Sequence, residues 1–155
     1  MGISAADVRA LFSTIVSSAQ QLGMFDRIIQ HEPKSAPGDG RSLAIWAGDD
    51  TSIPQLSGLA STSIRQEFNA RIYIPMLTEP QDSIEVDLLE ADFALKGAWS
   101  AGFTLGGLAF EVDLLGAYGT PLSSKKGYIN QDSRLYRISE IVCPVILVDV
   151  FNQAP

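Results

Sequence analysis

The sequence predicts an α+β fold: a mostly antiparallel sheet of four or five strands with two helices packed on one face. Two segments, residues 4–22 and 82–101, have the apolar spacing of helices. The strand-like segments follow one another without a helix between them, which favours antiparallel pairing. With 155 residues and no visible linker, the chain is predicted to form a single domain spanning 1–155.

Composition excludes some functions and leaves others open. The net charge of −7 argues against a nucleic-acid-binding domain held by phosphate contacts, because such domains are basic. Hydrophobic residues make up 46% of the chain, charged residues only 19%, and the mean hydropathy is +0.13. Either the core is large, or neighbouring subunits cover part of the apolar surface.

The chain contains one cysteine, Cys143, and one histidine, His31, so we expect neither a disulfide nor a metal site of these residues. The N-terminus lacks the basic start of a signal peptide, and no apolar run reaches the length of a membrane span. We therefore expect a soluble protein made in a cytoplasm, without a cofactor.

The first half of the chain predicts a helix and then strands. Ser4 and Asp7 form a plausible capping pair for the helix over 4–22, and Gly23 is its stop signal. Residues 25–32 and 42–47 are predicted strands, and residues 48–62 a loop. This loop carries Ile53, Leu56 and Leu59, which must either fold back on the core or contact another chain.

Residues 63–74 alternate between apolar and polar side chains, as expected for a half-buried strand. The helix over 82–101 follows, with Asp82 as the expected N-cap. Its apolar stripe contains Ile84, Leu88, Ala91, Leu95 and Trp99, is widened by Val86, Leu89 and Phe93, and leaves Glu85, Asp87, Glu90 and Asp92 on an acidic outer face.

The last third of the chain is predicted to contain two further strands. Gly106-Gly107 predicts a turn, residues 109–118 a strand, and residues 119–127 a polar, flexible loop. Residues 135–151 are the longest β-branched segment and predict one bent strand or two strands. Pro144 lacks an N–H and should lie at an edge, a bulge or a break.

The sequence contains no clear catalytic motif. Asp49-Asp50, with Glu111, could form a carboxylate site, but Asp and Gly are also expected where a strand ends. Cys143 could act as a nucleophile only if His31 approached it, and a buried, inert thiol is the better interpretation. We expect no catalytic, cofactor-binding or metal-binding residues.

One order of elements stands out: an amphipathic N-terminal helix, the strand SLAIWAGDD with a loop, the alternating strand IRQEFNARIYIPM, a helix at 82–101 and an apolar C-terminal strand. In this order the chain resembles the tail terminator (tail completion) proteins of long-tailed bacteriophages. The resemblance spans nearly the whole chain, and residues 42–76 carry most of it.

The resemblance implies a virion protein, assembled in the host cytoplasm, whose subunits close into a hexameric ring. The ring would cap the tail tube, end its polymerisation and join the head-side neck proteins, while DNA passes through the lumen. Candidate subunit or tube contacts are Ile53, Leu56, Leu59, Lys125 and Lys126. Three alternatives remain open: a head-closure protein or tube subunit, a small α+β enzyme subunit, and a small-molecule-binding module.

Overall fold

The computed structural model describes residues 3–101, 103–105 and 108–153, and these form an α+β domain. The predicted fold class is confirmed, but the predicted sheet of four or five strands was too small. The strands are β1 (Arg27–Ile29), β2 (Ser42–Ser52), β3 (Ser61–Pro75), β4 (Phe103–Leu105), β5 (Leu108–Val112), β6 (Ser123–Gln131) and β7 (Arg134–Asn152). The predicted turn at Gly106-Gly107 lies outside the described residues.

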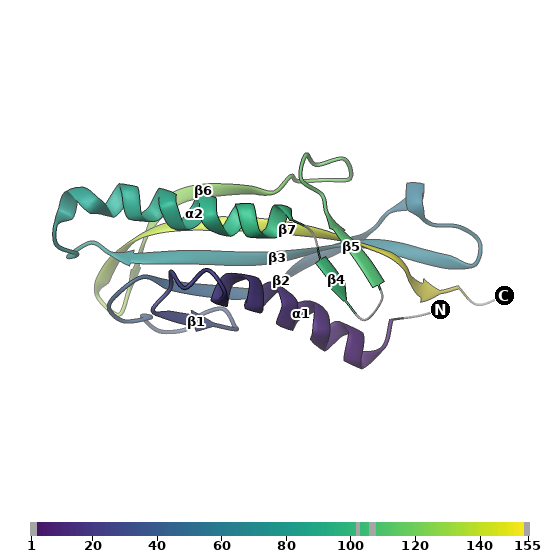
Figure 1. Ribbon diagram of the computed structural model, residues 1–155, viewed down its shortest axis with the longest axis horizontal. Coiled ribbons are helices and arrows are strands. Elements are labelled where there is room, and N and C mark those ends of the chain that lie inside the picture. Colours follow the sequence, from purple (N-terminus) through teal and green to yellow (C-terminus); the bar gives the residue numbers. More distant parts are fainter. Residues whose placement is uncertain (1–2, 102, 106–107, 154–155) are drawn as a thin grey trace.

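Six strands follow one another across the sheet as β1-β2-β3-β7-β5-β4, and β6 also pairs with β7. All described pairs are antiparallel except β1 with β2. The centre is the ladder between β3 and β7, which extends from Ser61 opposite Asn152 to Pro75 opposite Tyr136 (Figure 1). The domain is therefore elongated along these two strands.

The two helices, α1 (Ala5–Gln20) and α2 (Ile84–Ser100), contribute to one core cluster with the same side of the sheet, as predicted. Ser4 and Asp7 form the expected capping box of α1. The expected N-cap of α2 is wrong, because a 3-10 turn, η2 (Gln81–Ser83), precedes the helix and Ser83 occupies the cap position.

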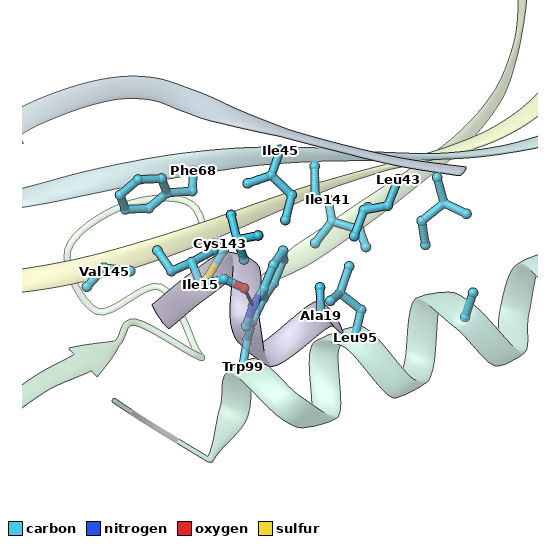
Figure 2. Packing of buried hydrophobic residues seen from close by; sticks show 14 of the residues in the cluster. Ile15, Ala19, Leu43, Ile45, Phe68, Leu95, Trp99, Ile141, Cys143 and Val145 are labelled. Atoms are coloured by element: carbon cyan, nitrogen blue, oxygen red, sulfur yellow. Dashed lines mark hydrogen bonds between the residues drawn. The ribbon is translucent and has the colours of Figure 1, made fainter. Parts of the chain in front are cut away.

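The core between the helices and the sheet is centred on Trp99, which has no solvent exposure (Figure 2). Its indole Nε1 donates a hydrogen bond of 3.4 Å to the carbonyl of Ile15, so the only polar atom of this side chain is paired. Ile45, Leu95 and Cys143 pack in the same cluster. The predicted stripe of α2 is confirmed, because its five residues are all buried: Ile84, Leu88, Ala91, Leu95 and Trp99. The helix α1 likewise buries one apolar face.

The opposite side of the sheet has a smaller core, which contains the fully buried Tyr73 and Tyr136. Their rings meet edge to face, with centroids 5.6 Å apart. The hydroxyl of Tyr136 donates to the carbonyl of Gly38 at 3.3 Å, so the loop before β2 covers this end of the sheet. The helix-free side is therefore only partly open to solvent.

The strand β7 is continuous across Pro144, contrary to the alternative of two separate strands. Along one edge of β7, the β6 ladder ends at Val142 and the β5 ladder begins at Val145. The missing N–H of Pro144 falls in this gap, which explains how a central strand accommodates proline. The irregular position is Asp149, with φ +56°, whose backbone N–H donates to Ser63 Oγ at 2.9 Å.

Two predicted loops are partly strand: one lengthens β2, and the other adds the strand β6 to the sheet. β2 continues to Ser52 across a register shift between Ala47 and Asp50, and a 3-10 turn, η1 (Pro54–Leu56), follows it. Residues 123–127, predicted as flexible loop, belong to β6 and pair with β7. Neither of the described helices is long and apolar enough to cross a membrane.

Candidate functional site

The three apolar residues predicted as contacts around residue 53 differ in exposure. Ile53 is only 3% exposed, and its backbone N–H donates to the carbonyl of Ser63 at 2.8 Å. It is a core residue, so its assignment to an interface was wrong. Leu56 is half-buried, whereas Leu59 is 99% exposed. Leu59 is the candidate that a second molecule could contact.

We define the β2–β3 tip as residues 53–60, and hydrogen bonds hold its backbone. Gly58 N–H donates to the carbonyl of Ser61 at 3.0 Å, and Ser57 Oγ donates to the carbonyl of Ile53 at 2.7 Å. Ser63 Oγ donates to the carbonyl of Leu56 at 2.8 Å. The tip therefore presents Leu59 from an ordered turn.

The predicted lysine contacts lie on β6 and have different surroundings. Lys125 is exposed and stands opposite Glu140 of β7. Lys126 reaches inward instead, and its Nζ lies 3.1 Å from Asp92 Oδ2. Lys126 is therefore an internal ion-pair partner as well as a surface residue, which the sequence did not indicate.

Asp92 was predicted on the outer face of the second helix, and this was wrong, because its side chain is fully buried. Lys96 Nζ lies 3.0 Å from Asp92 Oδ2, and Ser139 Oγ donates to Oδ1 at 3.0 Å. Burial acts to raise the pKa of Asp92, but the hydrogen bonds from Lys96, Lys126 and Ser139 outweigh it and leave the pKa lowered. This network joins α2 to β6 and β7.

A second buried ion network lies on the helix-free side of the sheet. Arg65, 5% exposed, donates from Nε to Asp113 Oδ2 at 3.1 Å and from Nη1 to Glu67 Oε2 at 2.6 Å. In the described part of the chain its Nη2 has no hydrogen-bond partner. Arg65 also lines a cavity of about 190 Å³ with Tyr118. Asp113 is thus a buried ion-pair partner of Arg65.

The outer α2 stripe, which we define as Val86, Leu89 and Phe93, was expected to widen the buried face of the helix. These side chains are instead 62%, 40% and 61% exposed. Their spacing is that of one helical face, so the helix has a buried apolar stripe on one side and an exposed one on another. An exposed apolar stripe is typical of a protein contact.

A groove of about 350 Å³ lies between α1 and the end of the sheet near the termini, and we call it the α1 groove. Phe12 of α1, Phe68 of β3 and Leu147 of β7 contribute to its lining. Val8 and Phe151 also line it and are themselves about half exposed. Of the described residues that line it, Asp50 alone is charged. The groove can therefore accept an apolar group.

The candidate catalytic groups do not come together. Asp49 and Asp50 lie on β2 and Glu111 on β5, which are separated by three strand spacings, roughly 14 Å. Among the described residues no group of three or more His, Cys, Asp or Glu side chains could hold a metal ion.

Cys143 is buried in the core, as predicted, and His31 is exposed. Burial raises the pKa of the Cys143 thiol to about 12, so almost none of it is thiolate near neutral pH. The pair therefore does not form a nucleophile and base.

Comparison with known proteins supports the fold. One solved structure, of a protein whose name states no function, matches this chain with a TM-score of 0.57 at 19% identity. The match covers 94% of this chain and 96% of that chain, so the likeness extends over the whole domain. At this identity it shows the fold alone. No protein-family model matches the chain, and no curated protein matches it in sequence.

Proposed function

We propose that this chain is a tail terminator of a long-tailed bacteriophage, a virion protein whose subunits form a ring on the end of the tail tube. The observation that carries the proposal is the presence of two separate exposed apolar surfaces, the outer α2 stripe and Leu59 of the β2–β3 tip. A ring subunit on a tube must contact its neighbours and the tube, so it needs more than one such surface.

The ring would be a hexamer that ends polymerisation of the tube and meets the head-side neck proteins. Its contacts would be head to tail, because a closed ring joins two different patches of each subunit. Six copies at −7 each would carry roughly −42, which favours a lumen that repels DNA and lets it pass. The order of elements in the sequence also supports this proposal.

The closest alternatives are a head-closure protein and a tube subunit, which also assemble through exposed apolar surfaces. An enzyme with a carboxylate site gains no support from the separated positions of Asp50 and Glu111. The position of the chain in the assembled particle distinguishes the structural alternatives. A terminator lies as one layer where the tube meets the neck, whereas a tube subunit repeats along the tail.

The decisive experiment measures mass by light scattering, with the protein alone and then with tail tubes from the phage that carries it. We expect a species of about 100 kDa, six times 16.7 kDa, or one ring bound at the tube end. Immunogold electron microscopy would locate the ring. A monomer that also fails to bind tail tubes would overturn the proposal.

A pair of variants tests the outer α2 stripe within the same experiment. Phe93→Ser should reduce binding to tubes or to neighbouring subunits at least tenfold, because a large apolar contact is removed while the core is untouched. Leu77→Ser is the matched control, since Leu77 is 85% exposed but lies in the turn after β3. Equal binding by both variants would show that the outer α2 stripe is not part of the contact.

A further inference from the structure

We propose that the β2–β3 tip of one copy docks in the α1 groove of a second copy, with Leu59 as the inserted side chain. The inference rests on the proposed ring and names its subunit contact. The chain contains both halves of such a contact, an exposed apolar side chain and an apolar groove. Leu59 cannot fill its own groove in this structure, because it is 99% exposed.

The order of the tip is the first argument for this contact. Hydrogen bonds within residues 53–63 hold the turn, and Gln153 N–H fixes it further by donating to the carbonyl of Ala60 at 2.9 Å. Because the backbone around Leu59 is already hydrogen-bonded, the turn loses little backbone freedom on binding, which favours docking of the tip.

Charge is the second argument. Residues 51–64 contain no charged side chain, although the whole chain carries −7, and Asp50 alone is charged among the described residues lining the groove. Two copies of an acidic protein repel each other over most of their surfaces. The tip and the groove can therefore bury apolar surface against each other with little charge repulsion.

Shape is the third argument. The tip extends past both helices at one end of the elongated domain (Figure 1). It can therefore reach a neighbour while the rest of the two sheets stay apart. The groove volume of about 350 Å³ lies within the rough 300–1,000 Å³ range of ordinary binding pockets.

Two substitutions separate the halves of the contact. Leu59→Asp charges the tip and Val8→Asp charges the rim of the groove, and both positions are exposed, so both variants should fold. Each variant alone should be monomeric at concentrations where the wild type assembles. An equimolar mixture retains one intact tip and one intact groove, and light scattering should show dimers only. If either variant alone assembled to the same mass as the wild type, the inference would be overturned.

Cysteine cross-linking tests the contact directly, in solution and on tail tubes. Leu59→Cys and Val8→Cys should form a mixed disulfide when combined under mild oxidation, and each alone should not. The native Cys143 is buried and should not interfere. The control pairs Leu59→Cys with Ser13→Cys, which is exposed on α1 and does not line the groove. Equal cross-linking of the control would overturn the inference.

The double variant Leu59→Cys with Val8→Cys distinguishes this inference from the proposed function. A ladder of cross-linked species up to a closed ring supports both. Dimers alone support docking but contradict a ring. Rings on tail tubes without any cross-link refute the docking and leave the proposed function standing. A monomer whose groove binds an apolar dye, with no cross-link, refutes the docking in favour of a small-molecule site.

Discussion

Asp92 is a fully buried carboxylate, and its neighbours are Lys96, Lys126, Ser124 and Ser139. A buried charge is tolerated only when partners replace the water that it loses. Here the partners come from α2, β6 and β7, so one side chain ties three elements together. Arg65 has the same role on the other side of the sheet, where it joins β3 to Asp113 after β5.

Replacing Asp92 tests this role. Asp92→Asn should lower the free energy of unfolding by about 3 kcal/mol at pH 7, because it leaves two lysines without their shared carboxylate. Urea unfolding measures the change. Glu90→Gln is the control on the same helix, and its exposed side chain should change stability by less than about 0.5 kcal/mol. Similar losses of stability in both variants would contradict the proposed role of Asp92 in joining α2, β6 and β7.

The pH dependence has a defined sign. The pKa of Asp92 is lower in the folded protein, so its stabilisation is complete above the ordinary value of about 3.9 and is lost as pH falls through the folded value. The stability difference between wild type and Asp92→Asn should therefore shrink in acid. Urea unfolding of both proteins between pH 7 and pH 3 measures it. A constant difference would contradict the lowered pKa.

Cys143 should be inert in the folded protein. Its thiol is buried and its pKa is raised to about 12, so a disulfide reagent at pH 8 should react only after unfolding. Absorbance of the released thiol, measured with and without guanidinium, gives the two rates. In the unassembled protein, Leu59→Cys provides an exposed control thiol that should react at once. Rapid reaction of the native protein would show that the core opens readily.

At the scale of elements, α2 serves two surfaces. Its inner stripe packs on the sheet through residues such as Leu95, and its outer stripe exposes Phe93 to solvent. The helix also carries Gly97, where an added Cβ would meet nothing within 4 Å, so a side chain has room there. Glycine has a lower helix propensity than alanine, so Gly97 weakens the last turn of α2 although the packing there does not require a glycine.

Gly97→Ala should stabilise the protein by about 0.5–1 kcal/mol, since alanine restricts the unfolded chain and favours the helix. Thermal unfolding should show a rise of about 1–4 °C in the melting temperature. Gly48→Ala is the contrasting variant, because its Cβ would lie 2.7 Å from Asn69 Nδ2 and should destabilise β2. A loss of stability in Gly97→Ala would show that this turn has a further contact.

At the scale of the whole molecule, the β3–β7 ladder is the axis of the domain (Figure 1). The helices cover one side of it, and loops cover part of the other. β1 is a three-residue strand paired only with β2 among the described strands. Stability should therefore fall from the centre of the sheet towards its edges.

Hydrogen exchange should show this gradient. Amides of β3 between Phe68 and Ile72, and those of the β7 residues paired with them, should exchange only by global unfolding. Amides of β1 should exchange by local opening. Mass spectrometry or NMR measures the rates. Assembly should add protection at the β2–β3 tip if the tip docks in a neighbour. Uniform exchange across the sheet would contradict this description.

The sequence predicted the elements whose burial follows a local period. The stripe containing Ile15 in α1 and the alternation around Phe68 in β3 lie in the core as expected. Asp92 could also have been found, because it lies at helical spacing between Leu88 and Leu95, within the buried stripe. β6 could not, because its polar residues, such as Ser124 and Asn130, have no strand period.

The sequence by itself determined the fold class, the inner faces of the main helices and strands, and the burial of Cys143, because a residue's nearest neighbours along the chain set these patterns. Only the tertiary structure decided the sheet order, the pairing of β6 with β7 and the burial of Asp92 among lysines. It also decided that Ile53 is buried while Leu59 is exposed. These features depend on contacts between residues far apart in the chain, whose partners a local pattern does not specify.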